Sequence, residues 1–264
     1  MKIGFIGCGN MASAIIGGII KNQLVPADDI MVSAKTKATL QRAADSFHVR
    51  TSLESRMVAE FADVLVLAVK PNVVGAVAEE IREIVRPDTV IVSIAAGREL
   101  SYLAEVLGDQ QKITRAMPNT PALVGEGMTA LCPNQNVTAE DLEKVSRIFN
   151  CFGRAEVVPE DLMPAVTAVS GSAPEYVFMF IESMADAAVH QGMERETAYK
   201  FAAQTVLGSA KMVLDSGLHI GKLRDMLMTP GGTTIEGLRV LEEKGMRGAV
   251  MDALIAASEK AKKL

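Results

Sequence analysis

The segment from Ile3 to Ala12 constrains the fold of this chain most, because an apolar strand runs directly into a glycine-rich turn. The turn places Gly7, Gly9 and Ala12 in the spacing G-x-G-x-x-A. In a dinucleotide-binding turn the first glycine permits the tight bend, and the second lets the backbone approach a pyrophosphate. The third small residue lets the following helix pack closely on the strand, and the N-terminus of that helix holds the anion. The segment therefore predicts a site for a nicotinamide or flavin cofactor.

Short β-rich runs alternate with helical stretches over the first 160 residues, as in a doubly wound sheet. The runs 64–69 and 89–94 are almost continuously apolar, which is typical of parallel strands that helices cover on both faces. The predicted strands are 2–6, 30–34, 64–69, 89–94, 112–116, 128–132 and 154–158. The clearest predicted helices are 10–22, 36–47 and 73–86, and a further helix capped by Thr138 is predicted over 138–151. We expect an α/β Rossmann-like domain over residues 1–160.

The second half of the chain lacks β-branched runs and has helical patterns instead. The predicted helices are 174–190, 194–216, 219–228, 234–244 and 246–263. Residues 176–181 and 201–213 are apolar on more than one side of their helices. Such helices need burial on several sides, which a domain of about 100 residues cannot easily provide by itself. We expect residues 161–264 to form an all-α domain through which the chain self-associates as a homodimer or larger homo-oligomer.

The composition and charge of the chain exclude several kinds of partner and site. The net charge of −5 argues against a nucleic-acid partner, which normally requires a basic surface. The N-terminus lacks the pattern of a signal peptide, and no apolar stretch is long enough to span a bilayer. The three cysteines Cys8, Cys132 and Cys151 form neither a disulfide framework nor a zinc pattern. We expect a cytoplasmic protein without a metal site, with reduced cysteines and no membrane partner.

Ligands of open α/β sheets bind beyond the carboxyl ends of the strands, where three segments of this chain are unusual. They are Ala68–Pro71, Ala95–Gly97 and Arg115–Pro121. Small residues let the backbone approach a flat ligand, and prolines rigidify the loops. Ordinary turn chemistry explains any one segment alone. The three together favour a cofactor edge.

The end of the second strand bears on which cofactor binds. An acidic residue there would hydrogen-bond the ribose of NAD, but the chain has Ser33-Ala34-Lys35-Thr36-Lys37 instead. Hydroxyl groups and cations suit the 2′-phosphate of NADP. The alternative is a solvated basic loop that opens the next helix.

Two polar segments open helices in the second half. Val169–Tyr176 leads into a long helix, with Pro174 suited to its first turn. Thr229–Glu236 carries two glycines and two threonines before another helix. Free backbone N–H groups and hydroxyls at a helix N-terminus are suited to binding a carboxylate.

Taken together and in this order, these segments resemble those of pyrroline-5-carboxylate reductases. The most specific parts are Arg115–Pro121, Ser170–Tyr176 and Pro230–Ile235, and the resemblance extends over essentially the whole chain. It implies reduction of 1-pyrroline-5-carboxylate to L-proline, the last step of proline biosynthesis. The resemblance implies NADPH as the electron donor, with NADH possible. It also implies a Rossmann domain followed by a helical dimerisation domain, with the substrate site at the dimer interface.

The resemblance and the residues that follow the second strand together give the expected site. The cofactor-binding residues are Ile6, Gly7, Cys8, Gly9, Asn10, Met11, Ser33, Lys35, Thr36, Ala68, Val69, Lys70, Pro71, Ala95, Ala96, Gly97 and Asn119. The substrate-binding residues are Met117, Gly231, Gly232, Thr233 and Thr234. The resemblance implies that backbone N–H groups of 231–234 hold the substrate carboxylate. It also implies that the Thr234 hydroxyl faces the ring nitrogen, which makes Thr234 the catalytic candidate.

Two alternatives remain open at the level of sequence. An NADP-dependent hydroxyacid dehydrogenase of similar architecture would carry a lysine on the first long helix of its second domain, but no lysine lies between Pro174 and His190. A non-catalytic NADP-binding sensor is the other alternative, because a fold does not fix a function. The paired glycines and threonines at 231–234 argue against a sensor.

Overall fold

The computed structural model describes residues 1–263, and it divides into two compact units. Unit 1 comprises Met1–Gly171 together with the segment that begins at Ser258, and unit 2 comprises Ser172–Ala257. Residues that follow 160 pack with unit 1, because Met163 is buried in a small core with Ala130 and Cys132. The chain therefore passes between the units twice.

Unit 1 is built on one sheet with the strand order β3-β2-β1-β4-β5-β6-β7-β8. The strands are β1 (Ile3–Ile6), β2 (Ile30–Ser33), β3 (Arg50–Ser52), β4 (Val64–Leu67), β5 (Val90–Ser93), β6 (Lys112–Met117), β7 (Gly127–Pro133) and β8 (Gly153–Val157). The strands from β3 to β6 are parallel, β7 is antiparallel to β6, and β8 is parallel to β7. The strand order reverses between β1 and β4, so the predicted doubly wound sheet is confirmed. Ligands of such sheets bind at this reversal.

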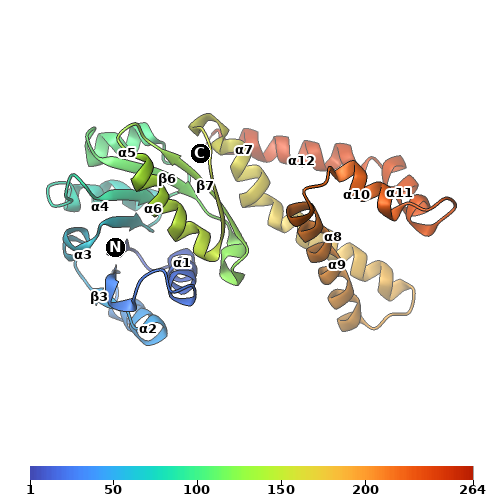
Figure 1. Ribbon diagram of the computed structural model, residues 1–264, viewed down its shortest axis with the longest axis horizontal. Coiled ribbons are helices and arrows are strands. Elements are labelled where there is room, and N and C mark those ends of the chain that lie inside the picture. Colours follow the sequence, from blue (N-terminus) through green and yellow to red (C-terminus); the bar gives the residue numbers. More distant parts are fainter. Residues whose placement is uncertain (264) are drawn as a thin grey trace. The chain divides into compact units, whose positions relative to one another are not determined.

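The helices of unit 1 cover both faces of the sheet (Figure 1). They are α1 (Asn10–Lys21), α2 (Lys37–Phe47), α3 (Ser55–Phe61), α4 (Val74–Ile81), α5 (Leu100–Leu107), α6 (Ala139–Phe149) and α7 (Met163–Val166). The helix predicted over 73–86 is shorter in the structure, where α4 ends at Ile81. The helix α6 begins at the predicted cap, since Thr138 and Asp141 form a reciprocal capping box.

Successive residues of the central strands face opposite cores. Phe5 and Val66 pack against α1, α2 and α6, whereas Leu65 and Leu67 pack against α3, α4 and α5. All four side chains are fully buried. Burial on both faces explains why these strands read as continuous apolar runs.

A continuous helical path leads from unit 1 into unit 2. After α7, residues Thr167–Ser172 form a π-helical turn, and α8 (Ala173–His190) follows with Pro174 in its first turn. Pro174 lacks the N–H that an α-helix would donate to the carbonyl of Ser170. The side chain of Asn119 donates to that carbonyl instead, at 3.0 Å. The proline therefore leaves an acceptor through which the π-helical turn is tied to the loop after β6.

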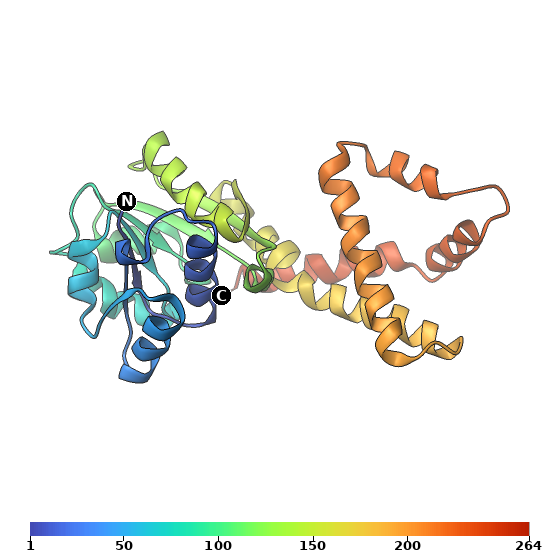
Figure 2. The same cartoon turned by 60° about the horizontal axis from the view of Figure 1, so that its bottom comes forward.

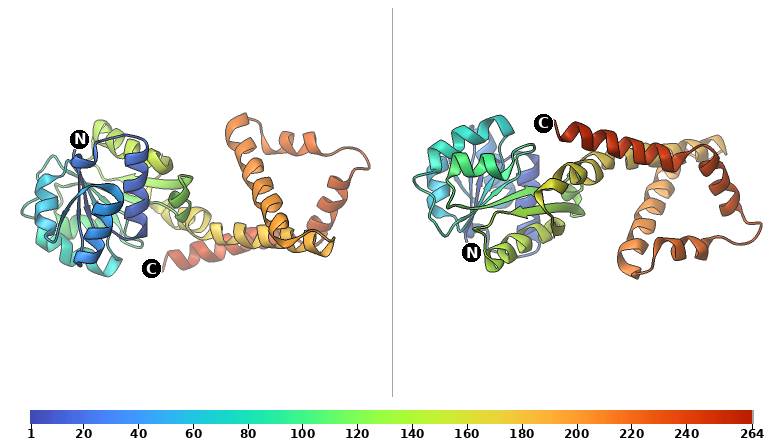
Figure 3. Two further views of the ribbon diagram at one scale, coloured as in Figure 1. Left: turned by 90° about the horizontal axis from the view of Figure 1, so that it is seen from below. Right: turned by 90° about the horizontal axis from the view of Figure 1, so that it is seen from above.

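Unit 2 is all-helical, as predicted. Besides α8 it contains α9 (Arg195–Ser216), α10 (Ile220–Leu227), α11 (Thr233–Glu243) and most of α12 (Met246–Ala261). The helices α8 and α9 contact each other (Figure 2). Their shared core contains the small buried residues Ala185, Ala198 and Ala202. From α9 the chain continues through α10 and α11 and returns along α12, so that these four helices enclose a wide open loop (Figure 3). Among the described residues, no helix combines the length and apolar character that a membrane crossing requires.

Candidate active site

The loops at the carboxyl ends of neighbouring strands are joined by backbone hydrogen bonds. Gly7 N donates to Ser33 O at 2.8 Å, and Ala68 N donates to Ile6 O at 2.8 Å. Ile94 N donates to Leu67 O at 3.2 Å. These bonds connect the loops after β2, β1, β4 and β5 in that order. The structure therefore brings the predicted cofactor residues of these loops to one edge of the sheet.

Gly7 and Gly9 have different structural roles within the turn after β1. Gly7 has φ +99°, and a Cβ there would lie 2.3 Å from the carbonyl oxygen of Ala68. Only glycine fits that position. A Cβ on Gly9 would meet no protein atom within 4 Å. The backbone of Gly9 therefore faces open space, as close approach of a pyrophosphate requires.

The N-terminus of α1 has no capping side chain, so its first N–H groups remain available for an anion. Ala12 is buried beneath the turn, as predicted from its small size. Burial raises the pKa of the Cys8 thiol, while a hydrogen bond to Ser13 partly offsets this effect. The thiol is therefore uncharged at neutral pH and does not repel a phosphate.

The predicted phosphate-binding residues after β2 differ in their surroundings. The Ser33 side chain is buried, and its hydroxyl has no hydrogen-bond partner among residues 1–263. Lys35 is exposed. The Thr36 hydroxyl caps α2 by accepting from Thr39 N at 3.2 Å, so this hydroxyl has a structural role in addition to the predicted one. The Ser33 hydroxyl is enclosed by protein atoms, so contact of Ser33 and of exposed Lys35 with the 2′-phosphate of NADP stays a prediction.

A small cavity adjoins the turn after β1 on the side of α1 and α2. Its volume is about 290 Å³, and its lining includes Cys8, Gly9, Asn10 and Arg42. Arg42 belongs to α2 and was not among the predicted residues. No local motif marks it, because its position beside the turn depends on how α2 packs on α1.

The loops after β4 and β5 are held together by Arg98. Its Nε donates to the carbonyl oxygen of Pro71 at 3.0 Å, and its guanidinium lies 4.7 Å from the centre of the Tyr102 ring. Gly97, one residue earlier, has φ +71°. The predicted segments Ala68–Pro71 and Ala95–Gly97 are thus parts of one connected surface.

Asn119 is held by protein groups on both sides of its amide. Its Oδ1 accepts from Met128 N at 2.8 Å, and its Nδ2 donates to Ser170 O at 3.0 Å. The side chain therefore fixes the loop after β6 against β7 and the π-helical turn. Half-buried Met117 precedes this loop at the end of β6. Direct contact of Asn119 with a cofactor stays a prediction.

The glycine–threonine turn lies in unit 2, where it opens α11. Gly231 has φ +69°, and Gly232 N donates to Thr229 O at 3.0 Å. No side chain caps the helix, and Thr233 and Thr234 are exposed in its first turn. The turn therefore presents several backbone N–H groups and two hydroxyls, which suit a carboxylate. The structure keeps the four predicted residues 231–234 together and places them in a different unit from the cofactor residues.

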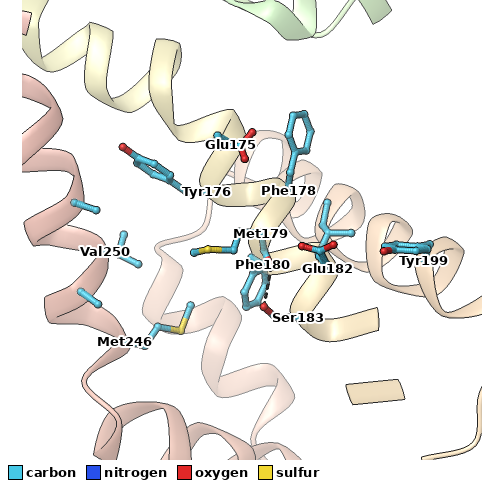
Figure 4. Close-up of a pocket in the computed structure, with 13 residues that line it drawn as sticks. Glu175, Tyr176, Phe178, Met179, Phe180, Glu182, Ser183, Tyr199, Met246 and Val250 are labelled. Atoms are coloured by element: carbon cyan, nitrogen blue, oxygen red, sulfur yellow. Dashed lines mark hydrogen bonds between the residues drawn. The ribbon is translucent and has the colours of Figure 1, made fainter. Parts of the chain in front are cut away.

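A broad apolar groove in unit 2 is lined by residues of α8, α9 and α12 (Figure 4). Its volume is about 1040 Å³, and its lining includes Tyr176, Phe178 and Met179 of α8 and Met246 and Val250 of α12. None of the predicted substrate residues lines this groove. Phe178 and Met179 are 59% and 64% exposed, respectively.

Two family models match the chain in succession. Residues 2–97 match the family described as NADP oxidoreductase, coenzyme F420-dependent. Residues 160–264 match the family described as pyrroline-5-carboxylate reductase dimerisation. The first match covers the glycine-rich turn, and the second covers the glycine–threonine turn and the apolar groove.

Relatives match the chain along its full length. The pyrroline-5-carboxylate reductase of Escherichia coli strain K12 is 53% identical over 263 residues, which are 100% of this chain and 98% of the relative. That of Methanosarcina acetivorans is 43% identical over 263 residues, which are 100% of this chain and 97% of the relative.

Solved structures of reductases with this activity also match nearly the whole chain. A pyrroline-5-carboxylate reductase from Coxiella burnetii superposes with a TM-score of 0.95 at 36% identity, covering 99% of this chain and 97% of the other. A pyrroline carboxylate reductase from Plasmodium falciparum, solved with NADP bound, has a TM-score of 0.85 at 35% identity. It covers 100% of this chain and 97% of the other. Each likeness includes both units of the chain.

Proposed function

The chain belongs to the pyrroline-5-carboxylate reductase family, and from that membership we propose which of its residues carry the reaction. It is an oxidoreductase of proline biosynthesis that reduces the C=N bond of 1-pyrroline-5-carboxylate with NADP(H). The observation that carries this function is the full-length identity of 53% with a reductase of that name. The site geometry described above supports the roles of individual residues.

The cofactor is assigned to the edge of unit 1. The free N–H groups at the start of α1 and the open space at Gly9 are suited to the pyrophosphate. Ser33 and Lys35 are assigned to the 2′-phosphate, and residues 95–97 to the nicotinamide end. When bound, the reduced nicotinamide supplies a hydride. The protein then has to hold the substrate carbon in line with it.

The substrate carboxylate is assigned to the turn 231–234. Backbone N–H groups of this turn bind the carboxylate, and the positive end of the α11 dipole stabilises its charge. The Thr234 hydroxyl orients the imine nitrogen and holds a proton near it. A protonated imine is already an electrophile, so few further catalytic side chains are needed.

Substitution of Thr234 tests this assignment. We expect Thr234→Ala to lower kcat/KM for the imine by about 10- to 100-fold, since a hydrogen bond to a charged group contributes about 1.5–3 kcal/mol. Thr234→Ser keeps a hydroxyl and should stay within about threefold of the wild type. The Kd for NADPH, measured by nucleotide fluorescence, should be the same in all three proteins. Unchanged kcat and KM in Thr234→Ala would remove the hydroxyl from the mechanism.

The assembly is proposed to be a homodimer formed through unit 2, with a second copy covering the groove of α8 and α12. The match of residues 160–264 to a dimerisation family supports this assembly, as do the exposed apolar side chains of α8 and α9. We also propose a cytoplasmic protein with no nucleic-acid partner. The three free cysteines and the net charge of −5 support that view.

A further inference from the structure

Glu160 connects three segments that are far apart in the sequence. It lies just after β8, and its Oε1 accepts two hydrogen bonds. One comes from Leu100 N at 2.8 Å and the other from Arg115 Nη1 at 2.9 Å. The Arg115 side chain is only 14% exposed, and that of Glu160 is 33% exposed. The pair is therefore partly shielded from water.

The bond to Leu100 fixes the start of a helix. Leu100 is the first residue of α5, and the preceding Glu99 makes no capping hydrogen bond with its side chain. Glu160 therefore provides the acceptor, and its negative charge suits the N-terminus of a helix. Since residues 94–99 lead into α5, this bond holds the far end of the loop that contains Ala95–Gly97.

The same loop is attached to its other neighbour through Arg98, which donates to Pro71 O. Contacts thus run from the loop after β4, through the loop after β5, to Glu160 and on to Arg115 at the end of β6. The middle segment contains residues 95–97, which are assigned above to the nicotinamide end.

We propose that Glu160 is a positioning residue for the reduction, which holds residues 94–99 and the end of β6 at a fixed spacing. The proposal rests on the cofactor site proposed above. Glu160 acts through Leu100 and Arg115 and touches neither cofactor nor substrate. A misplacement of about 1 Å at the reacting atoms costs about 100-fold in rate. Because Gly9 and Ser33 lie on other loops, binding of the pyrophosphate and of the 2′-phosphate should not depend on Glu160.

The test compares Glu160→Ala with Glu160→Gln in the full chain. Alanine removes both hydrogen bonds, whereas the amide oxygen of glutamine still accepts from Leu100 N and Arg115. We expect kcat for the imine to fall about 10- to 100-fold in Glu160→Ala and to stay within about threefold of the wild type in Glu160→Gln. The Kd for NADPH and the ratio of the NADPH and NADH affinities should change by less than about threefold.

A readout that does not use catalysis is hydrogen exchange at the Leu100 amide. This exchange should become faster in the cofactor-free Glu160→Ala protein and not in Glu160→Gln. Asp161→Ala is the matched control, because Asp161 is an exposed carboxylate in the same turn with no hydrogen bond or ion pair identified within residues 1–263. Arg98→Ala is a second variant that loosens the same loop from its other side, and it should also lower kcat.

Failure of the positioning role and failure of the proposed function would give different results. Normal kcat in Glu160→Ala would overturn the positioning role, and so would equal losses in Glu160→Ala and Glu160→Gln. Absence of imine turnover by the wild type would overturn the proposed function together with the positioning role. A loss of kcat in Glu160→Ala, with near-normal NADPH binding and recovery in Glu160→Gln, supports the role.

Discussion

At the scale of single residues, substitutions of Gly7 and Gly9 should affect different properties, the stability of the fold at Gly7 and the binding of the cofactor at Gly9. Gly7→Ala would place a methyl group 2.3 Å from Ala68 O at φ +99°, so we expect the cofactor-free protein to lose about 1–3 kcal/mol of stability. A Cβ added at Gly9 would meet no protein atom within 4 Å, so we expect the Gly9→Ala protein to be as stable as the wild type. Its Kd for NADPH should rise, because the methyl group would occupy the space of the pyrophosphate. Thermal unfolding and nucleotide titration measure both effects.

The control for this pair is Gly17→Ala on α1, the helix that follows the turn, where a Cβ makes only an ordinary contact of 3.5 Å with Phe47. We expect this variant to be as stable as the wild type or up to about 1 kcal/mol more stable, with unchanged NADPH binding. Wild-type affinity in Gly9→Ala would contradict the pyrophosphate assignment.

Lys35 is expected to discriminate between the two nicotinamide cofactors. Lys35→Ala should raise the Kd for NADPH about 10-fold, because a charge-assisted hydrogen bond to phosphate is lost. The Kd for NADH should not change, since NADH has no 2′-phosphate. Lys37→Ala, which removes another exposed lysine two residues later, is the control and should change neither affinity. Parallel weakening of both cofactors in Lys35→Ala would argue for a general electrostatic effect.

At the scale of elements, the cap of α6 should make stability depend on pH. Burial tends to raise the pKa of Asp141, but hydrogen bonds from Lys112 and from the hydroxyl and N–H of Thr138 outweigh it and lower the pKa to about 2. A lowered pKa in the folded state stabilises the fold above about pH 4, and this contribution is lost as the pH falls through about 2. We expect Asp141→Asn to cost up to about 2 kcal/mol at pH 7.

Urea unfolding of both proteins between pH 7 and pH 3 measures this contribution, and the difference between them should shrink as the pH falls. Glu140→Gln is the control, because Glu140 pairs with Lys144 on the same helix but is 80% exposed. It should cost less than about 0.5 kcal/mol. A difference for Asp141→Asn that is independent of pH would contradict the role of its charge.

Local signals explain which elements the sequence predicts. The apolar strands, the capped helix α6 and the turn after β1 carry their information within a few neighbouring residues, so they could be predicted. The strand Arg50–Ser52 is short, polar and at the edge of the sheet, so no apolar pattern marks it. The roles of Glu160 and Asn119 depend on partners 45 to 60 and 9 to 51 residues away, respectively. Such pairings arise only from the tertiary fold.

At the scale of the whole molecule, the apolar surface of unit 2 should determine the oligomeric state. Phe178→Glu places a charge in the groove of α8 and α12, so we expect a shift toward monomer in sedimentation velocity. The Tm of the wild type should rise with protein concentration, and that of the variant should not. The control Lys200→Ala alters an exposed ion pair on α9 and should leave the assembly intact. A variant that sediments like the wild type would place the interface elsewhere.

The double passage of the chain between units makes unit 2 an insertion within unit 1. Residues from Ser258 onward belong with the nucleotide-binding unit, and Ala261 and Lys262 line a small cavity there with Arg115 and Glu160. A gene truncated after Gly171 would therefore encode an incomplete unit 1. A proteolytic cut near Gly171 would divide the chain into two polypeptides, and unit 2 would then be held to residues 1–171 only by the non-covalent packing of the segment from Ser258 onward. This connectivity means that no single cut divides the chain into a complete unit 1 and a complete unit 2.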